Sequence, residues 1–231
     1  MKAAGFDLGN TLISYDKFPL NWQSLYAEVL GKVLEALNSE ADHCKIDAGI
    51  EILKKYNSRI NYRETEITSD IIFRELFSAW NIASTKDMCK AKQIFYGHFQ
   101  TEASLYSDTF AALQLIKDKG IKVGVLTDVA YGMDREYIMK DLEPIADYID
   151  VILTSTETGF RKPNPNSFLS MLEKLNVRPD EIIYVGDEEK DIVGANNLGI
   201  YSVLIDRKGN NTDYGQKLTI RSLLELKELF L

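Results

Sequence analysis

Strand-like and helix-like segments alternate along the second half of the chain, and this constrains the fold more than any other feature. Short apolar runs at 121–126, 150–153, 182–185 and 201–205 predict buried strands. Helical patterns follow or separate them at 110–119, 134–142, 166–175, 190–198 and 223–230. Such alternation predicts an α/β fold, a doubly wound and mostly parallel sheet with helices on both faces.

The first strand of this sheet is expected at 1–7, far from the others in sequence. Between them, 22–104 contains helical patterns and no strand pattern. Apolar residues recur at a helical period from Leu25 to Leu37, and further helices are expected around Ile50 and Leu53, after Ser69 and after Thr85. We therefore expect an α/β core formed by 1–13 and 105–231, with 14–104 inserted as a helical cap whose aromatic residues, such as Tyr62, Trp80 and Tyr96, form the bundle core.

Composition excludes several classes of protein. The 231 residues are 45% apolar, enough for a substantial core, and the net charge of -8 with no Lys/Arg block argues against nucleic-acid binding. Cys44 and Cys89 are isolated, which disfavours a zinc site or a disulfide framework. No secretory leader and no apolar run of membrane-spanning length is present, so a cytoplasmic protein with no membrane partner is expected.

Polar residues lie at the ends of the expected strands. Asp7, Thr127 and Asp187 each follow a strand, and Lys162 lies in a loop just before a helix. Ligand sites of open parallel sheets lie beyond the carboxyl ends of the strands, so these side chains should converge at one edge. After Asp7, the Gly-Asn-Thr sequence ending at Thr11 can turn the backbone and offer N–H and hydroxyl donors to a phosphate.

Four motifs in this order resemble the haloacid dehalogenase superfamily of hydrolases, which are chiefly phosphatases. The resemblance spans nearly the whole chain, with the helical insertion between the first and second motifs. The residues that carry it are Phe6-Asp7-Leu8-Gly9-Asn10-Thr11-Leu12, Val125-Leu126-Thr127-Asp128, Gly159-Phe160-Arg161-Lys162-Pro163 and Val185-Gly186-Asp187-Glu188-Glu189-Lys190-Asp191.

The resemblance implies a Mg²⁺-dependent hydrolase of a small phosphorylated metabolite. Asp7 would be the nucleophile that forms an aspartyl-phosphate. Asp7, Asp187 and Asp191, with the carbonyl of Gly9, would hold Mg²⁺ through oxygen ligands.

The phosphate-binding residues follow from the same resemblance. Thr127, the N–H of Asp128 and the loop residue Thr11 would bind the phosphate, and Lys162 would neutralise both the phosphate and Asp7.

Two positions depart from the family pattern. Gly9 stands where the phosphatases carry a second acid that protonates the leaving group, and Asp128 stands where Asn is more usual. Positioned acid–base catalysis contributes roughly a hundred- to ten-thousand-fold, so alkyl phosphates would need a replacement acid. The candidates are Asp16, Asp128, Glu64 and Glu66.

Alternative interpretations stay open. The same Asp7 and Mg²⁺ would serve a phosphonate hydrolase, which would want a Schiff-base lysine such as Lys54 or Lys55. Without the second acid, the protein would also suit a catalytically weak binder of a phosphorylated ligand. Taken singly, Asp7 reads as a turn residue and Asp187 as an acid at a helix start.

Overall fold

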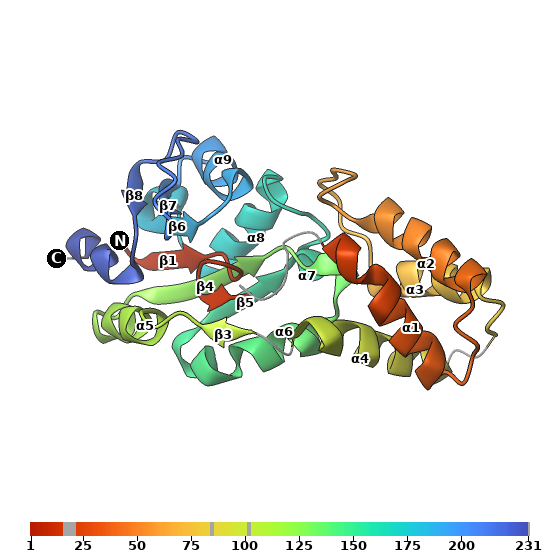
Figure 1. Cartoon of the computed structure of the whole chain (residues 1–231). Coiled ribbons are helices and arrows are strands. Elements are labelled where there is room, and N and C mark those ends of the chain that lie inside the picture. Colours follow the sequence, from red (N-terminus) through yellow and green to blue (C-terminus); the bar gives the residue numbers. More distant parts are fainter. Residues whose placement is uncertain (16–21, 84–85, 101–102, 231) are drawn as a thin grey trace. The chain divides into compact units, whose positions relative to one another are not determined.

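The computed structural model describes residues 1–15, 22–83, 86–100 and 103–230. Contacts divide the chain into two compact units (Figure 1). Unit 1 comprises Met1–Tyr15, Ala103–Asp128 and Asp141–Leu231, and unit 2 comprises Asp16–Glu102 and Val129–Lys140. Two predictions, a replacement acid at Asp16 and a helix start at Thr85, lie outside the described residues.

A parallel sheet forms the centre of unit 1, which confirms the predicted α/β class. Among the described residues its six strands run in the order β5-β4-β1-β6-β7-β8, and every neighbouring pair is parallel. The short strand β8 was not predicted from the sequence. The strands are β1 (Ala3–Phe6), β4 (Lys122–Thr127), β5 (Val151–Thr154), β6 (Ile182–Gly186), β7 (Tyr201–Ile205) and β8 (Leu218–Ile220).

Helices cover both faces of this sheet (Figure 1). They are α5 (Thr109–Asp118), α7 (Ser155–Thr158), α8 (Pro165–Leu175) and α9 (Glu189–Asn197). A further helix, α6 (Arg135–Leu142), begins in unit 2 and ends in unit 1 along the chain. The last predicted helix is instead a 3₁₀ helix, Leu223–Leu229, as are Glu143–Tyr148 and Pro179–Glu181. A separate antiparallel pair joins β2 (Ile13–Ser14) to β3 (Ser104–Leu105).

Two glycines let α8 pack closely on the sheet. A Cβ at Gly5 would lie 2.8 Å from Tyr184 Cδ2 and 2.9 Å from Met171 Cε, and one at Gly124 would lie 2.9 Å from Leu175 Cδ1. These contacts are closer than real Cβ atoms tolerate, so the strands carry glycine where the helix approaches. Lys162, in the loop before α8, contacts Asp7 at the end of β1 and the Leu126 carbonyl near the end of β4.

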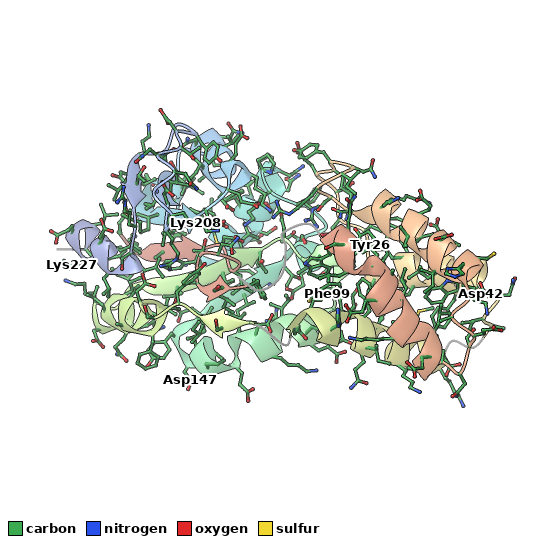
Figure 2. All side chains as sticks on the ribbon, in the orientation of Figure 1. Tyr26, Asp42, Phe99, Asp147, Lys208 and Lys227 are labelled. Carbon is green, nitrogen blue, oxygen red and sulfur yellow. The ribbon has the colours of Figure 1, made fainter. Side chains whose placement is uncertain are left out.

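Unit 2 contains an aromatic interior. Tyr26 and Phe99, labelled in Figure 2, are 0% and 2% exposed, and Trp22 stacks on Phe99 with ring centroids 3.6 Å apart. Trp80 is buried as expected, but Tyr62 is 69% exposed, so its assignment to the bundle core was wrong. The elements are α1 (Tyr26–Ala36), α2 (His43–Tyr56), α3 (Ser69–Ala79) and α4 (Lys86–Gln100), with 3₁₀ helices at Trp22–Leu25 and Ala130–Gly132.

The stretch Val129–Lys140 joins unit 2, although it follows a core strand in sequence. The Tyr96 hydroxyl donates to the Tyr131 carbonyl at 2.8 Å, and the Ser69 hydroxyl donates to Asp134 at 2.8 Å. These partners lie far apart in sequence, which is why the expected core boundaries included this stretch. No helix in the described residues is both long and apolar enough to cross a membrane.

Candidate active site

The loop after β1 holds Asp7 at the end of the strand. The Asp7 N–H donates to the Val185 carbonyl at 2.9 Å, so the strand pairing extends to this residue. Asn10 then takes a left-handed conformation with φ 55°, which Asn tolerates better than most residues, and its N–H donates to the Ile13 carbonyl at 2.7 Å. The carboxylate is therefore fixed by a tight loop at the edge of the sheet.

The side chain of Arg207 stabilises this loop. Its Nη2 donates to the Thr11 carbonyl at 2.7 Å, and the guanidinium pairs with both oxygens of Asp108 at 3.0 Å. Asp108 occupies the N-cap position of α5 but makes no capping bond through its side chain, since its carboxylate accepts hydrogen bonds from Arg207, Ser222 and Leu223 instead. Sequence reasoning missed Arg207 because Asp108 lies far away along the chain.

Thr11 is fully buried within the same loop. Its side chain is 0% exposed, and its hydroxyl has no hydrogen-bond partner among the described residues. The predicted phosphate donor therefore lies in the motif but is enclosed by protein. Its buried, unpaired hydroxyl is the kind of polar group whose burial ordinarily costs stability.

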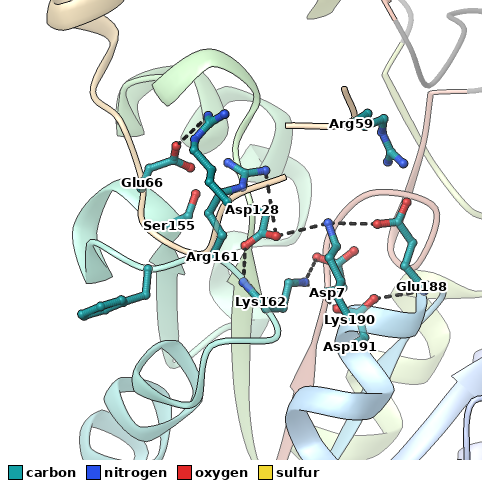
Figure 3. A network of polar contacts seen from close by, with 12 residues as sticks. Asp7, Arg59, Glu66, Asp128, Ser155, Arg161, Lys162, Glu188, Lys190 and Asp191 are labelled. Carbon is teal, nitrogen blue, oxygen red and sulfur yellow. Dashed lines mark hydrogen bonds and ion pairs between the residues drawn. The ribbon is translucent and has the colours of Figure 1, made fainter. Parts of the chain in front are cut away.

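Lys162 lies between two of the predicted acids. Its Nζ is 2.6 Å from Asp7 Oδ1 (Figure 3) and 2.6 Å from Asp191 Oδ1. The side chain of Lys162 is 0% exposed. Burial alone would lower the pKa of this lysine, but the charges of Asp191 and Asp7 raise it well above its usual value. A cation is therefore held permanently against the carboxylate of Asp7.

Asp7, Asp187 and Asp191 form an acidic cluster. One oxygen from each lies within 4.8 Å of the others. Burial, followed by the charges of Asp7 and Asp191, raises the pKa of Asp187 from 3.8 to about 8, and burial also raises the pKa of Asp191 to about 6. Lys162 supplies one positive charge to three buried carboxylates, which is too little to offset their burial and mutual repulsion. A converging set of oxygen ligands short of positive charge fits a hard divalent cation such as Mg²⁺.

Gly186 lets Asp191 approach the end of β6. A Cβ at Gly186 would lie 2.4 Å from both Cβ and Cγ of Asp191, whose side chain is 0% exposed. Asp191 Oδ2 accepts the N–H of Glu188 at 3.0 Å. Glycine at position 186 is thus a steric requirement of the cluster, because Asp191 occupies the place of its side chain.

Asp128 lies at the centre of a second group of charges. Its Oδ1 accepts the Lys162 N–H at 3.0 Å, and its Oδ2 is 3.2 Å from Lys190 Nζ and 3.9 Å from Arg161 Nη2 (Figure 3). Burial opposes its ionisation, but Lys190, Lys162 and Arg161 together lower the pKa of this carboxyl. Asp128 is therefore ionised and already paired, which makes it a poor replacement acid.

Lys190 was not singled out from the sequence. It bridges Asp128 to Glu188, whose carboxylate lies 2.9 Å from its Nζ, and so connects the second and fourth motifs. The feature of the sequence that could have identified Lys190 as a site residue is its position in the fourth motif, two residues after Glu188. Thr127, the last residue of β4, is buried beside Asp128.

Tyr15 covers the position of the missing acid. A Cβ at Gly9 would lie 3.6 Å from Tyr15 Cε2, and the Tyr15 hydroxyl donates to Asp141 Oδ2 at 2.9 Å. Burial, followed by the charges of Asp141 and Asp7, raises the pKa of Tyr15 well above its usual value.

The two candidate acids in unit 2 both have partners. Glu66 pairs with Arg63 at 3.2 Å, and Glu64 accepts the Tyr62 hydroxyl at 2.7 Å.

The order of the motifs, the acidic cluster and the parallel sheet agree with a comparison against known families. Residues 6–205 match the model of the haloacid dehalogenase-like hydrolases. The chain belongs to this family. The predicted resemblance is thereby confirmed, and the fold described above is that of the family's α/β core.

Two curated relatives are phosphatases by name. A ribulose-1,5-bisphosphate 5-phosphatase of Halopiger xanaduensis is 33% identical over 113 residues, 48% of this chain and 46% of that protein. A glyceraldehyde 3-phosphate phosphatase of Methanopyrus kandleri is 34% identical over 109 residues, 47% of this chain and 46% of that protein. The chain spans about half the length of the curated relatives it matches.

A solved structure resembles the whole chain. The 2-haloacid dehalogenase from Pseudomonas syringae pv. Tomato superposes with a TM-score of 0.75 at 22% identity, covering 99% of this chain and 97% of that one. At this identity the likeness concerns the fold alone.

Proposed function

We propose that the protein is a Mg²⁺-dependent phosphohydrolase that acts on a small phosphorylated molecule through an aspartyl-phosphate at Asp7. The observation that carries the proposal is the contact of Asp7 with Lys162 beside an acidic cluster, all in the loops of one sheet edge. Relatives named as phosphatases of small sugar phosphates support the substrate class.

Asp7 is suited to nucleophilic attack. Lys162 Nζ contacts Oδ1, and within the described parts of the chain no hydrogen bond to Oδ2 is found. Oδ2 would attack phosphorus, the bond from phosphorus to the leaving oxygen would break, and water would then hydrolyse the acyl phosphate to regenerate the carboxylate. Lys162, which stays protonated, would offset negative charge on the transferring phosphoryl group.

Asp7, Asp187 and Asp191 would hold Mg²⁺, with the Gly9 carbonyl as a further oxygen ligand. When bound, the ion supplies positive charge that reduces the repulsion between an anionic nucleophile and an anionic phosphate. The Thr127 hydroxyl and the Asp128 N–H would bind phosphate oxygens, while the Asp128 carboxylate, paired with Lys190, would keep this loop in place.

Unit 2 would act as the cap that selects the substrate and excludes water during the reaction. Its aromatic interior gives it a core of its own. The phosphonate alternative would need a lysine of lowered pKa, but Lys54 and Lys55 pair with Glu51 and Glu75 at the surface. No observation on the described residues favours that alternative.

The test is phosphate release from para-nitrophenyl phosphate, whose leaving group needs little protonation. Wild type should turn over with Mg²⁺ and lose activity in EDTA, and Asp7→Asn should abolish turnover. Asp147→Asn, the same substitution at an exposed site in unit 1, is the matched control. Equal activity of Asp7→Asn and wild type would refute the proposal. A binder would instead show no turnover and a ligand-dependent rise in Tm.

A further inference from the structure

The side-chain direction at Gly9 faces the ring of Tyr15. An ideal Cβ built at Gly9 would meet Tyr15 Cε2 at 3.6 Å and Cδ2 at 3.8 Å, which is ordinary van der Waals contact. A methyl group would fit there, but a longer side chain would have to displace the ring or pass beside it. The ring therefore borders the space into which an acid at position 9 would extend.

The hydroxyl of Tyr15 is committed elsewhere. It donates to Asp141 Oδ2 at 2.9 Å, and Asp141 is the first residue of unit 1 after the chain returns from unit 2. A phenol whose hydrogen points to a carboxylate does not offer that hydrogen to a leaving oxygen. What Tyr15 presents to Gly9 is the edge and face of an apolar ring.

In this arrangement neither Gly9 nor Tyr15 supplies a proton to the leaving group next to Asp7. The leaving oxygen must keep the electron pair of its broken bond to phosphorus without a positioned acid at residue 9. That is costly for an ordinary alkoxide, and a general acid would lower the barrier by an amount equivalent to roughly a hundred- to ten-thousand-fold in rate. Phosphate, carboxylate, phenolate or the anomeric oxygen of a sugar departs with far less need of protonation.

We propose that Tyr15, together with Gly9, determines specificity for phosphates with acidic leaving groups, such as anhydrides, acyl phosphates and anomeric sugar phosphates, over esters of simple alcohols. The inference rests on the proposed function. In the first step the Asp7 oxygen bonds to phosphorus and the leaving group departs as an anion. In the second, water bonds to phosphorus, the bond between phosphorus and the Asp7 oxygen breaks to regenerate the carboxylate, and both protons of the water stay on the phosphate, which leaves as H2PO4⁻.

The test is the dependence of kcat/KM on the leaving group. A series from dinitrophenyl and nitrophenyl phosphate through phenyl phosphate to ethyl phosphate should show a steep, continuous fall for wild type. Tyr15→Phe should keep this steep slope, because the ring stays over Gly9. A shallow slope for wild type would overturn the inference, as would a Tyr15→Phe variant that loses activity selectively on ethyl phosphate, since the phenol would then be the acid.

A pair of double variants sharpens the test. Gly9→Asp with Tyr15→Ala adds an acid and clears the ring, and should gain about a hundred-fold on ethyl phosphate relative to nitrophenyl phosphate. Gly9→Asn with Tyr15→Ala has nearly the same shape without the acid and should show no such gain. Gly9→Asp alone should gain less than the double variant. An equal gain from Gly9→Asp alone would show that the ring does not obstruct the acid.

The outcomes separate this inference from the function on which it rests. If no aryl phosphate is hydrolysed in an Asp7-dependent manner, the phosphohydrolase proposal fails and this inference fails with it. If turnover depends on Asp7 but the leaving-group slope is shallow, only the specificity inference is overturned. Melting curves of every variant identify those that fail to fold, and Tyr15→Phe, which keeps the ring, then still decides the question.

Discussion

Replacing Lys162 with methionine tests how much the buried ammonium group stabilises the protein when no metal is bound. Methionine keeps most of the aliphatic stem in a position that is 0% exposed, so the lost interaction is chiefly the ammonium group between Asp7 and Asp191. Breaking a buried ion pair by removing one partner costs about 3–5 kcal/mol. At 2–4 °C per kcal/mol for a protein of this size, the Tm in EDTA should fall by roughly 6–20 °C.

Metal should restore much of that loss. A divalent cation supplies positive charge to the same three carboxylates, so the Tm deficit of Lys162→Met should shrink by at least half in saturating Mg²⁺. Differential scanning fluorimetry with and without EDTA measures both values. Lys227→Met is the control, because Lys227 lies at the surface of unit 1 with 59% side-chain exposure, and its loss should cost about 1 kcal/mol or less. A deficit in EDTA no larger than that of the control, or one unchanged by Mg²⁺, would refute the reasoning.

Three further predictions concern the metal site and unit 2. Asp187 has a folded-state pKa of about 8 against 3.8 unfolded, so metal-free protein should lose stability as pH rises from about 4 to 8; Asp187→Asn should flatten that dependence in urea titrations. Gly186→Ala should weaken Mg²⁺ binding at least ten-fold by calorimetry, because its Cβ would lie 2.4 Å from Asp191 Cβ. Gly132→Ala should lower the Tm by several degrees, since the φ of Gly132 is 62° and the new Cβ would lie 2.1 Å from the Ile67 carbonyl oxygen. An unchanged pH dependence, Mg²⁺ affinity or Tm in the corresponding variant would contradict the argument for that variant.

The sheet could be predicted from sequence because its strands are short apolar runs bounded by local signals. Asp7 and Asp187 stand directly at the ends of β1 and β6, where apolar residues give way to Gly and acid. Strand ends are local features, and parallel strands bring them to one edge of a sheet. The predicted acids could thus be assigned to a shared site without knowledge of any contact.

Partners distant in sequence could not be predicted in this way. Arg207 donates to the Thr11 carbonyl although the two residues lie at opposite ends of the sequence. Tyr15 lies beside Gly9 while its hydroxyl donates to the distant Asp141. The residues next to Arg207 in the sequence do not indicate its contact with Thr11, and those next to Tyr15 do not indicate its contact with Asp141. β8 was missed for a different reason, because its three residues include an exposed threonine and present no apolar run.

Segments at the unit boundary were also hard to predict. Val129–Lys140 reads as the continuation of a core strand into a core helix, yet its partners lie in α3 and α4 of unit 2. The pattern of a helix indicates which of its faces is apolar but does not indicate which core that face joins.

The charges of the acidic cluster lead to a last prediction about the order of binding. At a pH above about 8, where Asp187 is ionised, the three carboxylates of the cluster carry a combined formal charge of -3 and Lys162 carries +1, which leaves -2 at the place where a phosphate would bind. A phosphate anion would be repelled by that charge in a site largely removed from water, whereas a divalent cation brings the sum to zero. Inorganic phosphate should therefore raise the Tm only when Mg²⁺ is present. An equal rise in EDTA would mean that phosphate binds away from Asp7. Asp187→Asn is the control, because it removes one metal ligand and one negative charge together. The lost ligand should lower the affinity for Mg²⁺. The lost charge should make phosphate binding depend less on the metal.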